Sequence, residues 1–281
     1  MPHGAPAGAR RRAGVYTLAA AALVTQSAAY TATATRPTPL APDYVDGWAV
    51  TPKRSTWQGR ELMCLVVSDD PSVDNLHSVA HPDHPRYRAF EELEDPHGAL
   101  GVWPSAYAAC ASLQKIASEL KRPPTVLELG CGAGLPSLYA SVVLESPRVV
   151  ATDVEAVPLA FLEAARGAHV ETGSFATCTL DVTYAAVDDI RGFDVVVCAD
   201  MLYNTDVATA LGALLGAAAC GAGAPEFVVC DPGRRGRDHF LDAFGAASGL
   251  SPMFVDQAVP DGCVDVFDGT PIGAVGVLAA R

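Results

Sequence analysis

Apolar residues along 101–281 fall into two kinds of segment that alternate with each other. Thr125–Leu129 and Phe193–Ala199 are short, mostly apolar segments, which are typical of buried strands. Ser105–Leu120 carries its apolar residues at helical spacing instead, and a Pro-Pro pair at 123–124 follows it. The same patterns recur down the chain and predict helices over 134–144, 158–167, 205–220 and 238–247, and strands over 148–152, 175–180, 227–230, 253–258 and 274–279.

This order of elements predicts the fold class. Strands that alternate with helices form a parallel sheet with helices on both faces. The last two strands are joined by a loop alone, so we expect them to form an antiparallel hairpin. The sequence therefore predicts an α/β protein with a Rossmann-like, doubly wound sheet, mostly parallel with a C-terminal antiparallel hairpin, over residues 101–281.

Residues 43–100 form a separate region, which we interpret as a small N-terminal extension packed on the main domain. Leu62–Val67 is its one predicted strand, and proline-broken loops follow. Four histidines, at 77, 81, 84 and 97, lie in these loops without helical or strand spacing, so we expect no metal site.

Residues 1–42 contain four arginines and no acidic residue. Their apolar centre, Gly14–Val24, is shorter than the ~20 residues that span a bilayer. A basic start, a short apolar centre and small residues after it fit a removable targeting segment. A secretory signal and an organellar transit peptide both remain open, as does a plain disordered terminus. The length of the Ala/Thr-rich tail favours an organelle, plastid or mitochondrion; without such a segment the location is cytoplasmic.

Charge narrows the choice of partner. The formal net charge is −13, and without residues 1–42 it is −17, with 15 basic against 32 acidic residues. Such a chain attracts a phosphate backbone poorly and a cationic partner well. We therefore expect neither nucleic acid nor a membrane as partner, while the oligomeric state stays open. The eight cysteines show no zinc spacing and are expected to be small, buried hydrophobic residues.

A glycine-rich turn follows the strand at 125–129. Gly130, Gly132 and Gly134 stand where a helix begins, so backbone N–H groups can approach a ligand. The spacing departs from the G-x-G-x-x-G of dinucleotide sites. The acid two residues earlier, Glu128, would repel a pyrophosphate and attract the ammonium group of a methionine, directly or through water. These details favour S-adenosylmethionine over NAD.

Three further residues are candidates for the same cofactor site. Asp153 ends the next strand, where an acid can accept hydrogen bonds from ribose hydroxyls. Asp181 ends the following strand, near where this fold places the adenine amino group; a turn residue is the alternative. Trp103 precedes the first helix and either forms a wall of the pocket or belongs to the core.

The acceptor end of the site is predicted at Asp200-Met-Leu-Tyr203, after the fourth strand of the domain. Ligands bind outside the carboxyl ends of such strands. Asp200 and Tyr203 are therefore the candidate catalytic residues, because an acid there attracts and orients an ammonium group. A strand-end cap and a packed aromatic are the alternatives. At Asp231-Pro-Gly-Arg234, the acid and the arginine either bind substrate or fix the loop by an ion pair.

These motifs together resemble a known family. Gly101–Pro104, Val126–Gly134, Ala151–Asp153, Ala199–Tyr203 and Asp231–Arg234 are similar to segments of the seven-strand, class I protein-lysine methyltransferases (methyltransferase family 16). The likeness is strongest to the branch that modifies the β-subunit of electron-transfer flavoprotein. The resemblance implies that Asp200 and Tyr203 lie in the acceptor pocket, and that Glu128, the glycines and Asp153 hold S-adenosylmethionine. It implies an enzyme that methylates a lysine side chain of a protein substrate. A small-molecule amine as acceptor, or a non-catalytic cofactor-binding interaction protein, is the alternative.

Overall fold

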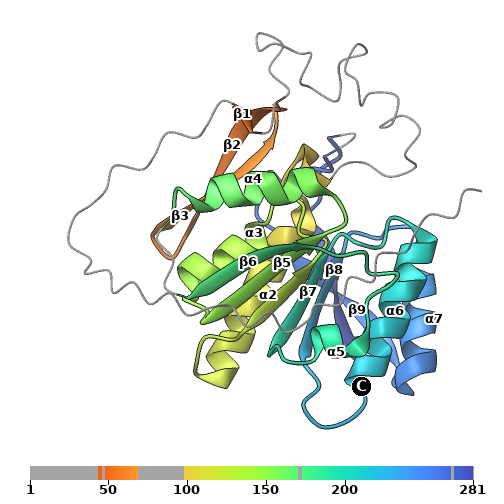
Figure 1. Cartoon of the computed structure of the whole chain (residues 1–281). Helices are drawn as coiled ribbons and strands as arrows, with labels where there is room; N and C mark the ends of the chain where they lie inside the picture. Colours follow the sequence, from red (N-terminus) through yellow and green to blue (C-terminus); the bar gives the residue numbers. More distant parts are fainter. Residues whose placement is uncertain (1–43, 46–47, 69–97, 170–172, 267–268, 281) are drawn as a thin grey trace, which may run out of the picture. The chain divides into compact units, whose positions relative to one another are not determined.

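The computed structural model describes residues 44–45, 48–68, 98–169, 173–266 and 269–280, and the targeting segment expected at 1–42 lies outside them (Figure 1). The four histidines at 77–97 are also outside the described residues. Within the described ranges, side chains form no cluster suited to a metal ion, and no disulfide links the eight cysteines. The helices described there are too short or too polar to cross a bilayer.

The main sheet has seven strands in the order β6-β5-β4-β7-β8-β10-β9. Its parallel part consists of β4 (Val126–Leu129), β5 (Arg148–Asp153), β6 (Ser174–Thr179), β7 (Val195–Ala199) and β8 (Glu226–Asp231). The antiparallel part consists of β9 (Pro252–Ala258) and β10 (Ala274–Ala280), and β10 pairs with both β8 and β9. This arrangement confirms the predicted Rossmann-like sheet with a C-terminal hairpin.

Helices cover both faces of this sheet (Figure 1). One group is α2 (Pro104–Leu120), α3 (Leu135–Leu138) and α4 (Ala156–Arg166), and the other is α5 (Val187–Ile190), α6 (Thr205–Ala219) and α7 (Arg237–Ser248). The two long helices α6 and α7 pack closely because Gly212 and Gly216 leave room for the α7 backbone. A Cβ at these glycines would lie 2.4 Å from the carbonyl oxygen of Phe240 and 2.6 Å from that of Phe244.

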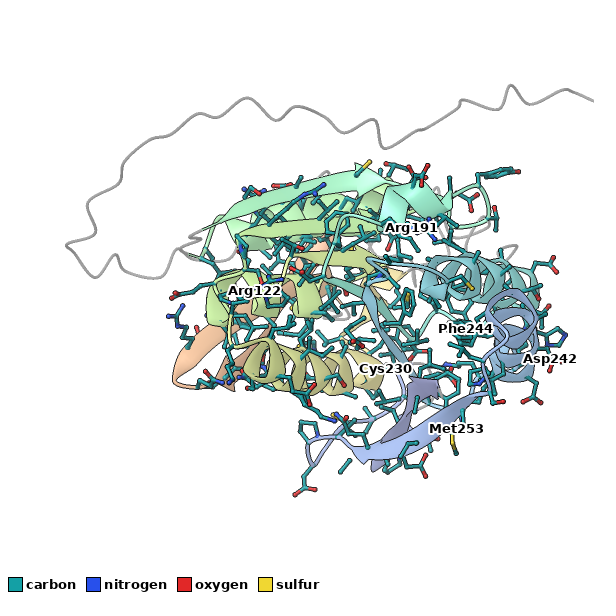
Figure 2. All side chains as sticks on the ribbon, turned by 90° about the horizontal axis from the view of Figure 1, so that it is seen from below. Arg122, Arg191, Cys230, Asp242, Phe244 and Met253 are labelled. Carbon is teal, nitrogen blue, oxygen red and sulfur yellow. The ribbon has the colours of Figure 1, made fainter. Side chains whose placement is uncertain are left out.

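Apolar strands in the middle of the sheet form the core. The side chains of β4 are all buried, and so are the first four of β7. Figure 2 shows Cys230 of β8 inside this core and Phe244 of α7 beside it, whereas Asp242 points outward from α7. Burial raises the pKa of the Cys230 thiol, which keeps it protonated and weakly reactive.

Residues 44–45 and 48–68 contain a small antiparallel sheet in the order β1-β2-β3. It consists of β1 (Tyr44–Val45), β2 (Trp48–Trp57) and β3 (Arg60–Val67). The β2–β3 turn has two residues with positive φ, Gln58 (49°) and Gly59 (77°). The hairpin contacts the main domain through Trp57, whose ring meets that of Tyr139 edge-on at 4.9 Å, and through Arg60, which pairs with Glu145 at 2.5 Å.

Three local features differ from the sequence-based expectation. The helix predicted over 134–144 is a short α-helix, α3, followed by a π-turn, η3 (Tyr139–Val143). The strand β2, which pairs with the predicted strand at 62–67, was not expected, because its outer half carries exposed Lys53 and Arg54 rather than an apolar run. The short helix α5 was also missed, since four residues are too few to show a helical period.

Candidate functional site

A pocket of about 310 Å³ lies at the carboxyl ends of β4, β5, β6 and β7. The predicted site residues all line it: Trp103, Glu128, Gly130, Gly132, Gly134, Asp153, Asp181, Asp200 and Tyr203. They come from separate parts of the chain, and the parallel sheet gathers them because its strands end along one edge. The structure thus brings together the glycine turn and the acceptor residues predicted from sequence.

The glycine turn between β4 and α3 has a backbone that other residues rarely adopt. Gly130, Gly132 and Gly134 have φ values of 66°, 50° and 73°. A Cβ at Gly132 would lie 2.7 Å from the carbonyl oxygen of Gly98. The segment η2 (Gly98–Leu100) therefore lies directly against the turn, and both line the pocket. Glycine is favoured in this turn because the backbone has positive φ values, and at Gly132 also because the Gly98 carbonyl oxygen leaves no room for a Cβ atom.

Asp153 connects the glycine turn to the end of β5. Its Oδ2 accepts a hydrogen bond from the Gly132 amide at 2.9 Å, and its Oδ1 accepts one from the Glu155 amide at 3.1 Å. Burial raises the pKa of this carboxyl group, and the two amide hydrogen bonds oppose the rise. Each oxygen keeps acceptor capacity beyond one hydrogen bond, so Asp153 can serve the turn and a ligand hydroxyl together.

Glu128 is the most deeply buried acid beside the turn, with 1% of its surface exposed. Its Oε2 accepts hydrogen bonds from the Ser137 amide at 3.0 Å and from the Ser137 hydroxyl. Burial raises the pKa of Glu128 to about 8, against the opposing effect of these hydrogen bonds. A pKa of about 8 favours the protonated form of Glu128 at neutral pH. Ser137, on α3, was not singled out from sequence.

Trp103 and Asp181 lie on the pocket walls. Trp103 precedes α2 and donates from Nε1 to the Gly98 carbonyl oxygen at 3.3 Å, which places the indole on the wall rather than in the core. Asp181 follows β6, and its Oδ1 accepts from the amide of Thr183 at 2.9 Å and from its hydroxyl at 2.6 Å. Asp181 is thus both a turn residue and a residue that lines the pocket.

Asp200, predicted to lie at the acceptor end of the site, follows β7 with a left-handed backbone, φ 62°, that is uncommon outside glycine. Its side chain is 4% exposed and forms a two-point ion pair with Arg234. Nε donates to Oδ1 at 2.7 Å and Nη2 donates to Oδ2 at 3.1 Å. Burial raises the pKa of Asp200, and Arg234 opposes that rise. The Asp200 carboxylate is therefore paired with Arg234.

Asp231, the last residue of β8, stabilises the loop that follows the strand. Asp231 is fully buried, accepts from the Gly233 amide at 2.9 Å and pairs with Arg237 Nε at 2.6 Å. Beside it, Arg235 donates from Nε to the carbonyl oxygen of Tyr203 at 2.6 Å. Of the two roles left open for this loop, the structure shows ion pairs that fix it, while Arg234 also lines the pocket.

The sequence model of the lysine methyltransferase family matches residues 82–244, more than half of the chain. The chain belongs to this family. It is an S-adenosylmethionine-dependent methyltransferase of class I, in agreement with the seven-strand sheet. A comparison with curated proteins gives no match.

Among solved structures, this methyltransferase is similar to magnesium protoporphyrin IX methyltransferase from Synechocystis, solved with bound S-adenosylhomocysteine. The identity is 13%, the TM-score is 0.45, and the match covers 63% of this chain and 84% of the other. It is also similar to a protein of Thermoplasma acidophilum, with 15% identity, a TM-score of 0.39, and coverage of 62% and 88%.

The residues of this methyltransferase fit S-adenosylmethionine. The ligand carries an ammonium group, two ribose hydroxyls and an adenine ring. The buried Glu128 can interact with the ammonium group, and Asp153 can accept hydrogen bonds from the ribose hydroxyls. Exposed Glu155 is a second carboxylate at the β5 end that sequence analysis overlooked. Apolar Leu180 and Val182 flank Asp181 and offer surfaces to a flat ring.

Proposed function

We propose that this methyltransferase transfers a methyl group to the ε-amino group of a protein lysine. The observation that carries the proposal is the location of Asp200 and Tyr203 on the same pocket as the glycine turn. An acceptor group that contacts Asp200 therefore shares a cavity with the cofactor. The description of the family as lysine methyltransferases supports the same substrate class.

The pocket residues have a definite role in such a reaction. S-adenosylmethionine supplies a methyl group on a positively charged sulfur. Methyl transfer needs the amine in its neutral form, and the pKa of free lysine is ~10.4. Apolar Val102, Ala199 and Val207 line the pocket near the acceptor residues and lower the pKa of an amine buried there. Asp200 orients the nitrogen, and this positioning accounts for most of the acceleration.

Net charge supports a cationic protein as substrate. The chain carries −13 overall, so it attracts a lysine-rich surface at long range. The N-terminal residues 1–42 lie outside the described residues, and we propose that they direct the enzyme to an organelle. The acceptor is then an organellar protein, and the β-subunit of electron-transfer flavoprotein is the first candidate from sequence resemblance.

The proposal is tested by incubating the protein with methyl-labelled S-adenosylmethionine and an organellar extract, and in parallel with the purified flavoprotein β-subunit. Label on a lysine of a protein band, located by mass spectrometry, is the expected result. Label in the small-molecule fraction alone would indicate that the acceptor is a small amine. Label in neither the protein nor the small-molecule fraction would indicate a cofactor-binding protein without catalytic activity. Gly132→Arg, which fills the glycine turn, is the matched inactive control.

A further inference from the structure

Arg234 connects the acceptor end of the pocket to three other parts of the molecule. Its Nε and Nη2 contact Asp200 at the end of β7, and its Nη1 lies 3.0 Å from Oδ2 of Asp265 in the β9–β10 connection. The guanidinium carbon lies 5.4 Å from the centre of the Trp103 ring. The Arg234 backbone amide is also held, by the Asp231 carboxylate at 3.2 Å.

These contacts fix the guanidinium on several sides. One edge of the guanidinium meets Asp200 in the two-point geometry that gives arginine–carboxylate pairs their directionality. A further nitrogen, Nη1, meets Asp265, and the group lies over the face of Trp103 within cation–π distance. The side chain of Arg234 is 21% exposed and that of Asp265 is 13% exposed, so solvent screens this pair only in part. Arg234 therefore has one well-defined place beside the pocket.

The β9–β10 connection reaches the pocket by a second contact as well. A Cβ at Gly101 would lie 2.8 Å from the Cγ atoms of Val266, so Val266 packs closely against the chain just before Trp103. Asp265 thus contacts Arg234, and Val266 packs against Gly101, two residues before Trp103. A loop about 30 residues beyond Arg234 in sequence helps to shape the acceptor side of the site.

We propose that Arg234 is a positioning residue of the acceptor site, and that Asp265 holds Arg234 in the orientation that fixes the Asp200 carboxylate. The inference rests on the proposed function, since it assigns to Asp200 the task of orienting the incoming amine. Arg234 acts through Asp200, and Asp265 acts through Arg234.

The pair has a chemical consequence for Asp200. Burial of a carboxyl group favours its protonated form, whereas a guanidinium within hydrogen-bond distance favours the anion. Without Arg234, Asp200 would be a buried acid with a higher pKa and without a fixed direction. Arg234 favours the anionic form of Asp200, which can accept hydrogen bonds from an amine. The charged and titratable groups that face Asp200 are Arg234, Asp231, Asp265 and Cys230, and Arg237 pairs with Asp231.

The test measures the titration of Asp200 directly. The protein is labelled with ¹³C at the aspartate carboxyl carbon, and the Asp200 resonance is assigned by its absence in Asp200→Asn. In Arg234→Gln we expect its titration midpoint to rise by about one to three pH units, because an opposite charge has been removed. Arg234→Lys keeps the charge and should recover part of that change. Asp265→Asn should give a smaller rise in the same direction.

Activity is the second readout. Arg234→Gln should lower the initial rate of methyl labelling of protein by roughly tenfold or more, with Arg234→Lys intermediate. Both variants should bind S-adenosylhomocysteine within about threefold of the wild type in a calorimetric titration. Arg54→Gln on β2, which removes an ion pair with Glu61 away from the pocket, is the matched control and should change none of these quantities.

The outcomes separate this inference from the proposed function. An unchanged Asp200 midpoint in Arg234→Gln, or an altered midpoint with unchanged labelling rate, overturns the positioning role. Failure of the wild type to label any protein overturns the proposed function, and the titration still shows whether Arg234 sets the pKa of Asp200. If the Arg234→Gln variant does not fold, the Asp200 titration and the labelling rate of Arg234→Lys and Asp265→Asn test the positioning role instead.

Discussion

The backbone amide of Gly132 donates a hydrogen bond to Oδ2 of Asp153 at 2.9 Å, across two neighbouring parallel strands. The acid that was predicted to bind a ribose therefore also holds the glycine turn in shape. A substitution of Gly132 or Asp153 should therefore affect both the shape of the glycine turn and the predicted binding of the ribose. The glycine turn and the predicted ribose site thus form one structural unit.

Substitution of Gly132 by alanine should remove cofactor binding. The new Cβ would lie 2.7 Å from the Gly98 carbonyl oxygen, at a φ of 50°, so the turn and η2 would have to separate. We expect the affinity for S-adenosylhomocysteine to fall by roughly 100-fold or more, measured by calorimetry. Gly223→Ala is the control, because Gly223 also has a positive φ but no atom within 4 Å of an added Cβ. Equal affinities in the two variants would contradict the assignment of the turn.

Cofactor binding at pH 7 should release a proton from Glu128. Its pKa is raised to about 8 by burial, so the free protein holds a proton there at pH 7. An ammonium group placed nearby favours the carboxylate and lowers that pKa, which expels the proton. Calorimetry at pH 7 in buffers of different ionisation enthalpy should detect release of close to one proton, and less above pH 8. If the Glu128→Gln variant released the same number of protons on cofactor binding, Glu128 could not be the source of the proton.

Replacement of Asp200 by alanine should abolish methyl transfer and retain cofactor binding. Asp200 lies at the acceptor end of the pocket, while the glycine turn, Glu128 and Asp153 are held by other contacts. The rate of label transfer should drop by roughly 100-fold or more, with S-adenosylhomocysteine affinity within about threefold of wild type. Turnover at the wild-type rate in this variant would remove Asp200 from the mechanism.

Asp194 should contribute to stability rather than to activity. It accepts hydrogen bonds from the Thr125 amide at 2.8 Å and hydroxyl at 2.9 Å, and pairs with Arg122 at 2.6 Å. Asp194→Ala should lower the free energy of unfolding by about 1–3 kcal/mol in urea denaturation. Exposed Asp242→Ala, the control, should change it by less than about 0.5 kcal/mol.

The pH dependence of the Asp194 contribution has a defined sign. Arg122 holds the pKa of Asp194 well below its ordinary value. The carboxyl group is therefore more acidic in the folded than in the unfolded protein, so its contribution is complete above about pH 5. It is lost as the pH falls through and below the ordinary carboxyl pKa of ~3.9. A stability difference between wild type and Asp194→Ala that stays constant from pH 6 to pH 3 would contradict this.

The strand–helix succession could be predicted from sequence because buried parallel strands are mostly apolar. β7 is apolar throughout, and β4 is apolar except for Glu128; each is followed by a turn residue with positive φ. The strand β2 could not be predicted in the same way. Its Lys53 and Arg54 are exposed, so its pattern lacks the apolar run that identifies a buried strand.

The pocket residues could be predicted because they lie at the ends of predictable strands. The residues that form hydrogen bonds or ion pairs with them could not be predicted. Ser137 contacts Glu128 only because α3 starts directly after the turn, and Asp265 contacts Arg234 across a loop whose path no periodicity determines. The ion pair of Asp200 with Arg234 likewise becomes visible only in three dimensions.

A crystal structure with S-adenosylhomocysteine bound would show directly whether the pocket holds the cofactor. We expect the amino acid part to lie against Gly130–Gly134 and Glu128, the ribose hydroxyls at Asp153, and the sulfur to face the space beside Asp200 and Tyr203. A ligand bound elsewhere, or one whose sulfur points away from Asp200, would contradict this expectation.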